Sequence, residues 1–165
     1  MIIILNGPLG IGKSTLAEAL TESIEGCVML DGDFMVAAHP AHSDGREHLH
    51  STVVLLVSHH QAFGYQHFVI NHIWRSPAEL DDLRRRLAPI DPDIRTFLLA
   101  LSADENVRRI ERRANARKSN ELEWERMTLE EERAALAAHT NSLGEPFDVA
   151  DPPPVLVRRM LQRLV

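Results

Sequence analysis

The chain has 165 residues, the size of one ordinary globular domain, and a formal net charge of −6. This charge argues against a broadly basic surface, so we expect neither nucleic acid nor a membrane as a partner. The single cysteine excludes an intrachain disulfide. The sequence has no leader-like segment or long apolar run, so we expect a cytoplasmic protein.

Short apolar segments alternate with helical patterns along the chain. Residues 1–5 are apolar on both faces and predict a buried strand, and residues 14–23 predict the helix that follows it. Similar apolar runs predict further strands at 27–30, 68–73, 96–101 and 146–149.

Between these strands the sequence carries helical periodicity and start signals. The capping boxes Ser76–Glu79 and Ser102–Glu105 each mark the first turn of a helix. Residues 35–44 lack a clear period and predict a loop, and 151–154 predict a turn. The remaining helices are expected at 47–61, 77–87, 103–117, 122–138 and 155–164.

This alternation indicates right-handed βαβ units. We therefore expect an α/β fold with one five-stranded parallel sheet and helices on both faces, forming a single domain over residues 1–165. Ligands of such sheets bind beyond the carboxyl ends of the strands, so functional side chains are sought directly after each strand.

The first strand runs into the sequence Gly-Pro-Leu-Gly-Ile-Gly-Lys-Ser-Thr at residues 7–15, which contains the P-loop pattern in full. The glycines let backbone N–H groups point at phosphate oxygens, and the helix N-terminus adds partial positive charge. Lys13 reaches the outer phosphates, and the Ser14 hydroxyl is a ligand for Mg²⁺. The pattern predicts ATP and Mg²⁺ as cofactors, with nucleotide contacts from Gly7, Leu9, Gly10, Ile11, Gly12, Lys13, Ser14 and Thr15.

The second strand ends in Asp31-Gly32-Asp33. A carboxylate here can accept a proton from an attacking hydroxyl, hold a magnesium-bound water or anchor a substrate. Asp-Gly is also a common turn, but its place after a buried strand favours a functional role.

The P-loop followed by Leu30-Asp31-Gly32-Asp33-Phe34 resembles the P-loop small-molecule and nucleotide kinases. Gluconate kinases carry a similar Asp-Gly-Asp-Phe, adenylylsulfate kinases a similar Asp-Gly-Asp, and shikimate kinases a related paired-aspartate turn. Chloramphenicol and tunicamycin-resistance phosphotransferase-like proteins share the layout. The resemblance implies a three-layer α/β/α fold of the nucleoside-monophosphate-kinase type and transfer of the ATP γ-phosphoryl group to a small acceptor. It places that acceptor near Asp31, Asp33, Phe34, Asn71 and His72.

The arginine-rich helix fits this resemblance. Arg109 and Arg113 are four residues apart and share one helix face. The run 109–113 resembles the start of a nucleotide-kinase lid, which implies a lid over about 109–127 with Arg117 and Lys118 in its mobile part. One arginine would lie near the adenine and another would neutralise the transferred phosphoryl group. A solvated basic face paired with Glu111 is the alternative. The resemblance also implies that the backbone after Asp148 holds the adenine.

The chain departs from the usual pattern after the third strand. An aspartate often stands there in P-loop proteins, whereas this chain has Asn71-His72. Asn71 can act neither as a base nor as a charged metal ligand, so the protein ligand of Mg²⁺ is expected to be Ser14 alone, with Asp31 or Asp33 acting through water. Asn71 can instead orient substrate or water. His72 is either a supporting group or a packed residue.

Eight histidines lie between His39 and His72. The segment 35–63, which holds most of them, is expected to cover the acceptor pocket. The histidines can help to bind a polar acceptor or simply face water. Without a nearby cysteine or a paired-ligand spacing, a zinc site is disfavoured.

The sequence thus predicts a kinase for a hydroxylated small molecule. An antibiotic, a sugar acid and a nucleoside-like acceptor remain open. The expected catalytic residues are Lys13, Asp31, Asp33, Arg109 and Arg113, with Asp31 slightly preferred to Asp33 as the base. The alternative is a nucleotide-binding regulatory module or an ATPase without a small acceptor. The guanine motif Asn-Lys-x-Asp of GTPases is absent.

Overall fold

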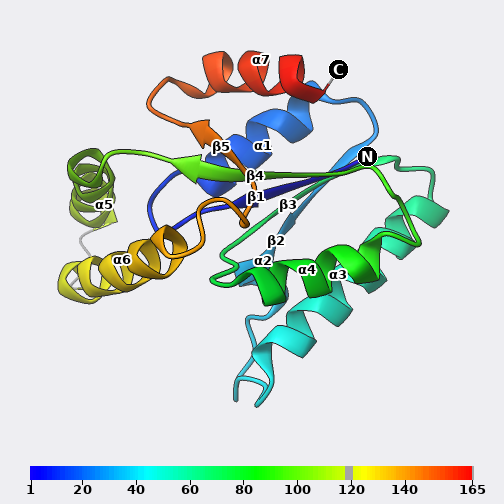
Figure 1. Cartoon of the computed structure of the whole chain (residues 1–165), viewed down its shortest axis with the longest axis horizontal. Coiled ribbons are helices and arrows are strands. Elements are labelled where there is room, and N and C mark those ends of the chain that lie inside the picture. Colours follow the sequence, from blue (N-terminus) through cyan, green and yellow to red (C-terminus); the bar gives the residue numbers. More distant parts are fainter. Residues whose placement is uncertain (118–120, 165) are drawn as a thin grey trace.

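A computed structural model describes residues 1–117 and 121–164. Its centre is one parallel sheet with strand order β2-β3-β1-β4-β5 (Figure 1). The strands are β1 (Ile2–Asn6), β2 (Cys27–Asp31), β3 (His67–His72), β4 (Ile94–Ala100) and β5 (Glu145–Asp148). The five-stranded parallel sheet expected from the sequence is confirmed.

Helices cover both faces of the sheet, which confirms the three-layer fold. Figure 1 shows α1 and α7 on one face and α3 and α4 on the other, with α5 and α6 beyond the carboxyl ends of the strands. The helices are α1 (Lys13–Ser23), α2 (Gly32–Met35), α3 (Gly45–Ala62), α4 (Pro77–Leu87), α5 (Ala103–Arg117), α6 (Leu122–Ala137) and α7 (Pro153–Leu164).

Side chains of the central strand β1 alternate between two hydrophobic cores. Ile2 and Ile4 belong to the core under α3 and α4, whereas Ile3 and Leu5 belong to the core under α1 and α7. Since all of them are fully buried, β1 is rigid and fixes the start of the loop that follows it.

Two local details differ from expectation. The segment 35–44 is mostly loop as predicted, but the Asp31 carboxylate accepts a hydrogen bond from the Asp33 amide and starts a short helix before it, α2, which the sequence did not indicate. Helix α7 begins at Pro153, inside the predicted turn, because proline is tolerated in the first turn of a helix.

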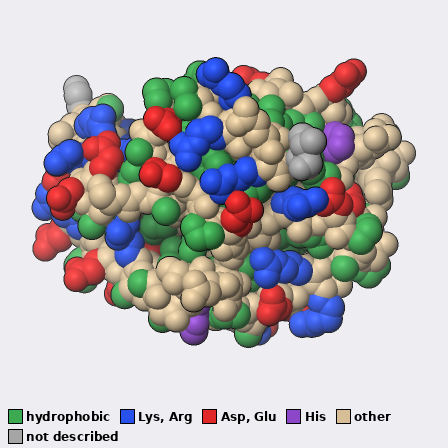
Figure 2. Space-filling view, turned by 45° about the horizontal axis from the view of Figure 1, so that its top comes forward, with side chains coloured by type: hydrophobic (Ala, Val, Ile, Leu, Met, Phe, Trp, Pro, Cys, Tyr) green, Lys and Arg blue, Asp and Glu red, His purple; other side chains and the backbone are tan. Residues whose placement is uncertain are grey.

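The outer surface mixes charges of both signs. Figure 2 shows Lys and Arg side chains interspersed with Asp and Glu across the face that carries α7. Among the described residues, no helix combines the length and apolar character needed to cross a membrane.

Candidate functional site

The loop between β1 and α1 has the backbone shape of a phosphate-binding loop. Gly10 and Gly12 have φ angles of 72° and 104°, which side-chain-bearing residues rarely adopt. The Lys13 ammonium donates to the carbonyls of Gly7 (2.8 Å) and Pro8 (3.1 Å). Burial lowers the pKa of Lys13, and the carboxylates of Glu132, Asp33 and Asp31 oppose that effect.

A cavity of about 700 Å³ opens in front of this loop. It is large enough for a cofactor-sized ligand. Its lining brings together the predicted loop residues from Leu9 to Thr15 with Asp33, Arg109 and Arg113, and adds the segment from Val149 to Pro153, whereas Gly7 does not line it. The lining residues are Leu9, Gly10, Ile11, Gly12, Lys13, Ser14, Thr15, Leu16, Asp33, Glu105, Arg109, Arg112, Arg113, Arg117, Val149, Ala150, Asp151, Pro152, Pro153 and Leu156.

Ser14, Asp31 and Asn71 form one cluster at the start of α1. Asp31 and Asn71 are register partners on β2 and β3. The Asp31 carboxylate oxygen Oδ2 accepts from the Ser14 hydroxyl (2.9 Å) and from the Asn71 amide (2.7 Å). The Asn71 carbonyl oxygen Oδ1 is buried without a hydrogen-bond partner. This set of hydroxyl, carboxylate and amide oxygens suits Mg²⁺, which binds oxygen ligands and retains water.

Asp33 lies apart from this cluster, at the first turn of α2. Its side chain is 79 % exposed, and its Oδ1 accepts from His72 Nδ1 at 3.0 Å. That hydrogen bond lowers the pKa of Asp33, with the nearby charges of His72 and Lys13 acting in the same direction. The carboxylate is therefore ionised, and it lines the cavity in front of the loop.

The two predicted arginines of α5 both line the cavity but have different partners. Arg109 donates to the carbonyls of Ile11 (2.9 Å) and Val149 (2.8 Å), so it ties the loop to the segment after β5. Arg113 pairs with Glu125 of α6 at 2.7 Å. Arg113 Nε and Glu125 Oε2 are buried without hydrogen-bond partners.

The sequence also allowed a solvated basic face on α5 whose arginines pair with Glu111. In the structure, Glu111 pairs with Arg126 of α6. Arg108 and Arg112 bind Glu105. The expected lid spans about 109–127, and its residues 118–120, which include Lys118, lie outside the described residues. The lid therefore stays a prediction.

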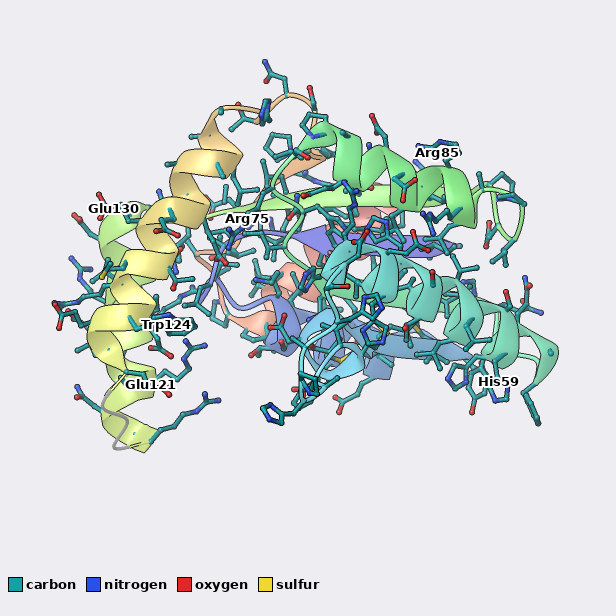
Figure 3. The ribbon with its side chains drawn as sticks, turned by 90° about the horizontal axis from the view of Figure 1, so that it is seen from below. His59, Arg75, Arg85, Glu121, Trp124 and Glu130 are labelled. Atoms are coloured by element: carbon teal, nitrogen blue, oxygen red, sulfur yellow. The ribbon has the colours of Figure 1, made fainter. Side chains whose placement is uncertain are left out.

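Three site residues were missed by sequence reasoning. The Asn106 side chain donates to the Leu9 carbonyl at 3.0 Å. Glu132 Oε2 accepts from the Leu9 amide at 2.6 Å, and its other oxygen pairs with Arg75 at 3.2 Å. Figure 3 shows Arg75 between the sheet and α6. The sequence carried only weak signals for these residues. Asn106 is a polar residue on the apolar face of its helix. Glu132 follows Glu125 by seven residues, which places both on one face of a helix.

The remaining acceptor residues are spread out. Phe34 is 82 % exposed on α2. His50 is fully buried, and it bonds Asp82 (2.8 Å) and the Trp74 indole (3.2 Å), so it is a structural residue. In the part of the chain that the structure describes, no three His, Cys, Asp or Glu side chains are grouped to hold a metal. An acceptor-covering role for 35–63 stays a prediction.

The fold matches solved structures over nearly the whole chain. A gluconokinase from Sinorhizobium meliloti superposes with a TM-score of 0.69 at 20% identity, covering 98% of this chain and 90% of that one. A tunicamycin resistance protein from Deinococcus radiodurans gives 0.71 at 16% identity, covering 99% and 94%. A shikimate kinase from Bacteroides thetaiotaomicron gives 0.69 at 16% identity, covering 99% and 98%.

These low identities establish a shared fold, and they confirm the resemblance to P-loop kinases at that level. No curated protein matches the chain. A family model described as an AAA domain matches residues 2–139, which include the P-loop, the Asp31 cluster and both α5 and α6. The chain therefore belongs to this AAA domain family.

Proposed function

We propose that this protein is an ATP-dependent kinase that transfers the γ-phosphoryl group to a hydroxyl of a small molecule. The observation that carries the proposal is the position of Asp33. An ionised, exposed carboxylate lies on the same cavity as the P-loop lysine and is held there by His72. This is the placement that a general base for an acceptor hydroxyl requires.

The groups around the cavity divide into binding roles. The loop amides and Lys13 bind the phosphates, while the backbone from Val149 to Pro153 lies where an adenine would be held. Ser14 would bind Mg²⁺ directly, with Asp31 and the unpaired Asn71 oxygen reaching its water molecules. When bound, the metal supplies positive charge on the phosphate oxygens.

The geometry favours Asp33 over Asp31 as the base, against the slight preference from sequence. Both oxygens of Asp31 already accept hydrogen bonds, from Ser14, Asn71 and the Asp33 amide. Asp31 is therefore engaged in the Ser14 cluster, whereas Asp33 lines the cavity and bonds His72 through one carboxylate oxygen.

The transfer step is a single displacement. The acceptor oxygen attacks the γ-phosphorus and gives its proton to Asp33, while the bond from that phosphorus to the bridging oxygen of ADP breaks. Lys13 and Arg113 lie where they can spread the negative charge of the transition state. The proton then passes from Asp33 to solvent, and ADP and the phosphorylated acceptor leave.

ADP release in the presence of a panel of hydroxylated small molecules tests the proposal. The panel should include sugar acids, aminoglycoside-type and nucleoside-type antibiotics, and nucleosides. We expect one class to stimulate ADP release. Asp33→Asn should lower kcat by about 10²–10⁴-fold while ATP still binds, as expected for loss of a general base. Lys13→Ala should weaken ATP binding itself.

The matched control is Asp81→Asn, an exposed acid on α4 that should leave the kinetics unchanged. If ATP binds but no acceptor stimulates ADP release, and Asp33→Asn behaves as the wild type, the kinase is excluded in favour of a nucleotide-binding module.

A further inference from the structure

Helix α6 carries two buried carboxylates, each of which pairs with a residue that lines the cavity at the P-loop. Glu125 and Glu132 are seven residues apart on the same buried face, whereas Glu130 and Glu131 are exposed. Acidic side chains are rarely buried unless they are paired. Glu132 is only 8 % exposed, so its partners matter for its role.

The first partner of Glu132 is the P-loop itself. Its Oε2 accepts from the Leu9 amide, in the half of the loop whose carbonyls at Gly7 and Pro8 hold the Lys13 ammonium. Desolvation lowers the pKa of Lys13, and Glu132 is the foremost carboxylate opposing that shift. The charge of Glu132 therefore interacts electrostatically with Lys13, the residue that is expected to bind the outer phosphates of a nucleotide.

The second partner is Arg75, which follows the carboxyl end of β3. Its guanidinium pairs with Glu132 Oε1 at 3.2 Å and is 49 % exposed. Figure 3 shows this arginine directed to α6 from the sheet side. One carboxylate therefore engages a loop amide and an arginine beside a lysine, which are the groups that ordinarily bind phosphate oxygens.

We propose that Glu132 occupies part of the position of the terminal phosphate of ATP, so that ATP must displace it whereas ADP need not. This inference rests on the proposed kinase function. Glu132 and a terminal phosphate are both anions that can bind the Leu9 amide and Arg75, so Glu132 weakens binding of the triphosphate relative to the diphosphate. Its displacement releases Arg75, which then faces the transferred phosphoryl group. Glu132 is thus a residue that sets the ATP-to-ADP preference.

Titration calorimetry with Mg²⁺ and either ATP or ADP, without any acceptor, tests the inference. Glu132→Gln keeps the size and the hydrogen-bond acceptor but removes the charge. We expect it to raise the affinity for ATP relative to ADP by about tenfold, within the usual range of coupling between sites. ADP affinity should stay within about twofold of the wild type, the change expected when a ligand's own contacts are kept. Glu130→Gln, on the outer side of α6 in Figure 3, is the matched control and should leave both affinities unchanged.

Arg75→Gln in the Glu132→Gln background should reduce the gain in ATP affinity, because the freed arginine contributes to it. An unchanged ATP-to-ADP ratio in Glu132→Gln, or a ratio that shifts towards ADP, overturns the inference and leaves Glu132 as a structural support of the loop. If Glu132→Gln does not fold, Glu132→Asp decides, because the shorter side chain withdraws the charge and should shift the ratio in the same direction.

The test separates this inference from the kinase proposal. A wild-type protein that binds ATP but phosphorylates no acceptor still gives a clear result for Glu132. A wild-type protein that binds neither nucleotide overturns both.

Discussion

At the scale of single residues, the structure explains the asparagine that stands in place of the usual acid near the carboxyl end of β3. Asn71 is the register partner of Asp31 and donates to its carboxylate. The negative charge beside Ser14 therefore comes from the neighbouring strand. Sequence reasoning found both residues, but only the structure shows that Asn71 and Ser14 donate to the same carboxylate oxygen of Asp31.

Asp31→Asn is predicted to raise the Mg²⁺ concentration for half-maximal activity by about tenfold or more, the scale of losing one supporting group of a metal site. The reason is loss of the carboxylate charge next to Ser14. ADP release measured across Mg²⁺ concentrations checks this. Asp33→Asn should lower kcat without moving the Mg²⁺ midpoint, and an unmoved midpoint in Asp31→Asn would remove Asp31 from the metal site.

Gly32→Ala is predicted to lower kcat by about tenfold or more through His72, a loss of the size that misplacing a catalytic group produces. A Cβ at Gly32 would lie 2.6 Å from the His72 ring, so the ring must move and release Asp33. The pKa of Asp33 should then rise towards its usual range. Steady-state kinetics with ATP titration checks this, with Gly45→Ala as the control because no atom lies near its Cβ. Equal kcat values for the two variants would argue against His72 as a positioning residue.

At the scale of elements, charged pairs join α3 to α4. Glu47 binds Arg86 through both carboxylate oxygens, at 3.0 and 2.7 Å. Asp82 bonds the buried His50 and also pairs with Arg86. Hydrogen bonding from Arg86, followed by that from Ser51, lowers the pKa of Glu47 to about 2.

This pairing predicts a loss of stability in acid. Because the folded-state pKa of Glu47 is depressed, the unfolded chain binds more protons below its ordinary pKa of 4.5. The contribution of Glu47 is fully present above that pH and is lost as the pH falls towards 2. Urea midpoints measured between pH 6 and pH 2.5 should therefore fall less for Glu47→Gln than for the wild type. Parallel curves for the two proteins would show that the pair is not formed in solution.

At the scale of the whole molecule, the proposed nucleotide site is assembled from parts far apart in the sequence. The P-loop, α5 and the segment after β5 line one cavity at the carboxyl edge of the sheet, and α6 reaches the loop through Glu132 (Figure 1). A ligand bound there should stabilise the entire domain, because it binds the folded state alone.

Mg-ATP at about 100 times its Kd should stabilise the fold by about 2.7 kcal/mol, which corresponds to a rise in Tm of roughly 5–10 °C for a domain of this size. Lys13→Ala should abolish most of this shift. Thermal unfolding with and without nucleotide measures it. Arg85→Ala, an exposed change on α4 labelled in Figure 3, should keep the full shift. A Lys13→Ala protein with an undiminished shift would place the nucleotide elsewhere.

The sequence alone predicted most of the fold and the centre of the site, because their signals are local. Strand alternation, the capping boxes and the spacing of Gly7, Gly12 and Lys13 each lie within a few contiguous residues. The spacing of four residues between Arg109 and Arg113 likewise predicts, from the sequence alone, that both lie on one face of α5. Such patterns depend on backbone geometry and need no knowledge of distant contacts.

Only the tertiary structure decided which carboxylate joins the Ser14 cluster and which lines the cavity, and that Glu132 reaches the P-loop. Leu9 and Glu132 are 123 residues apart, and their contact depends on how α6 packs over the edge of the sheet. Asp31 and Asp33 are alike in sequence, yet one lies in the Ser14 cluster and the other is held by His72. Their difference arises from neighbours on β3 and α1, which no local pattern encodes.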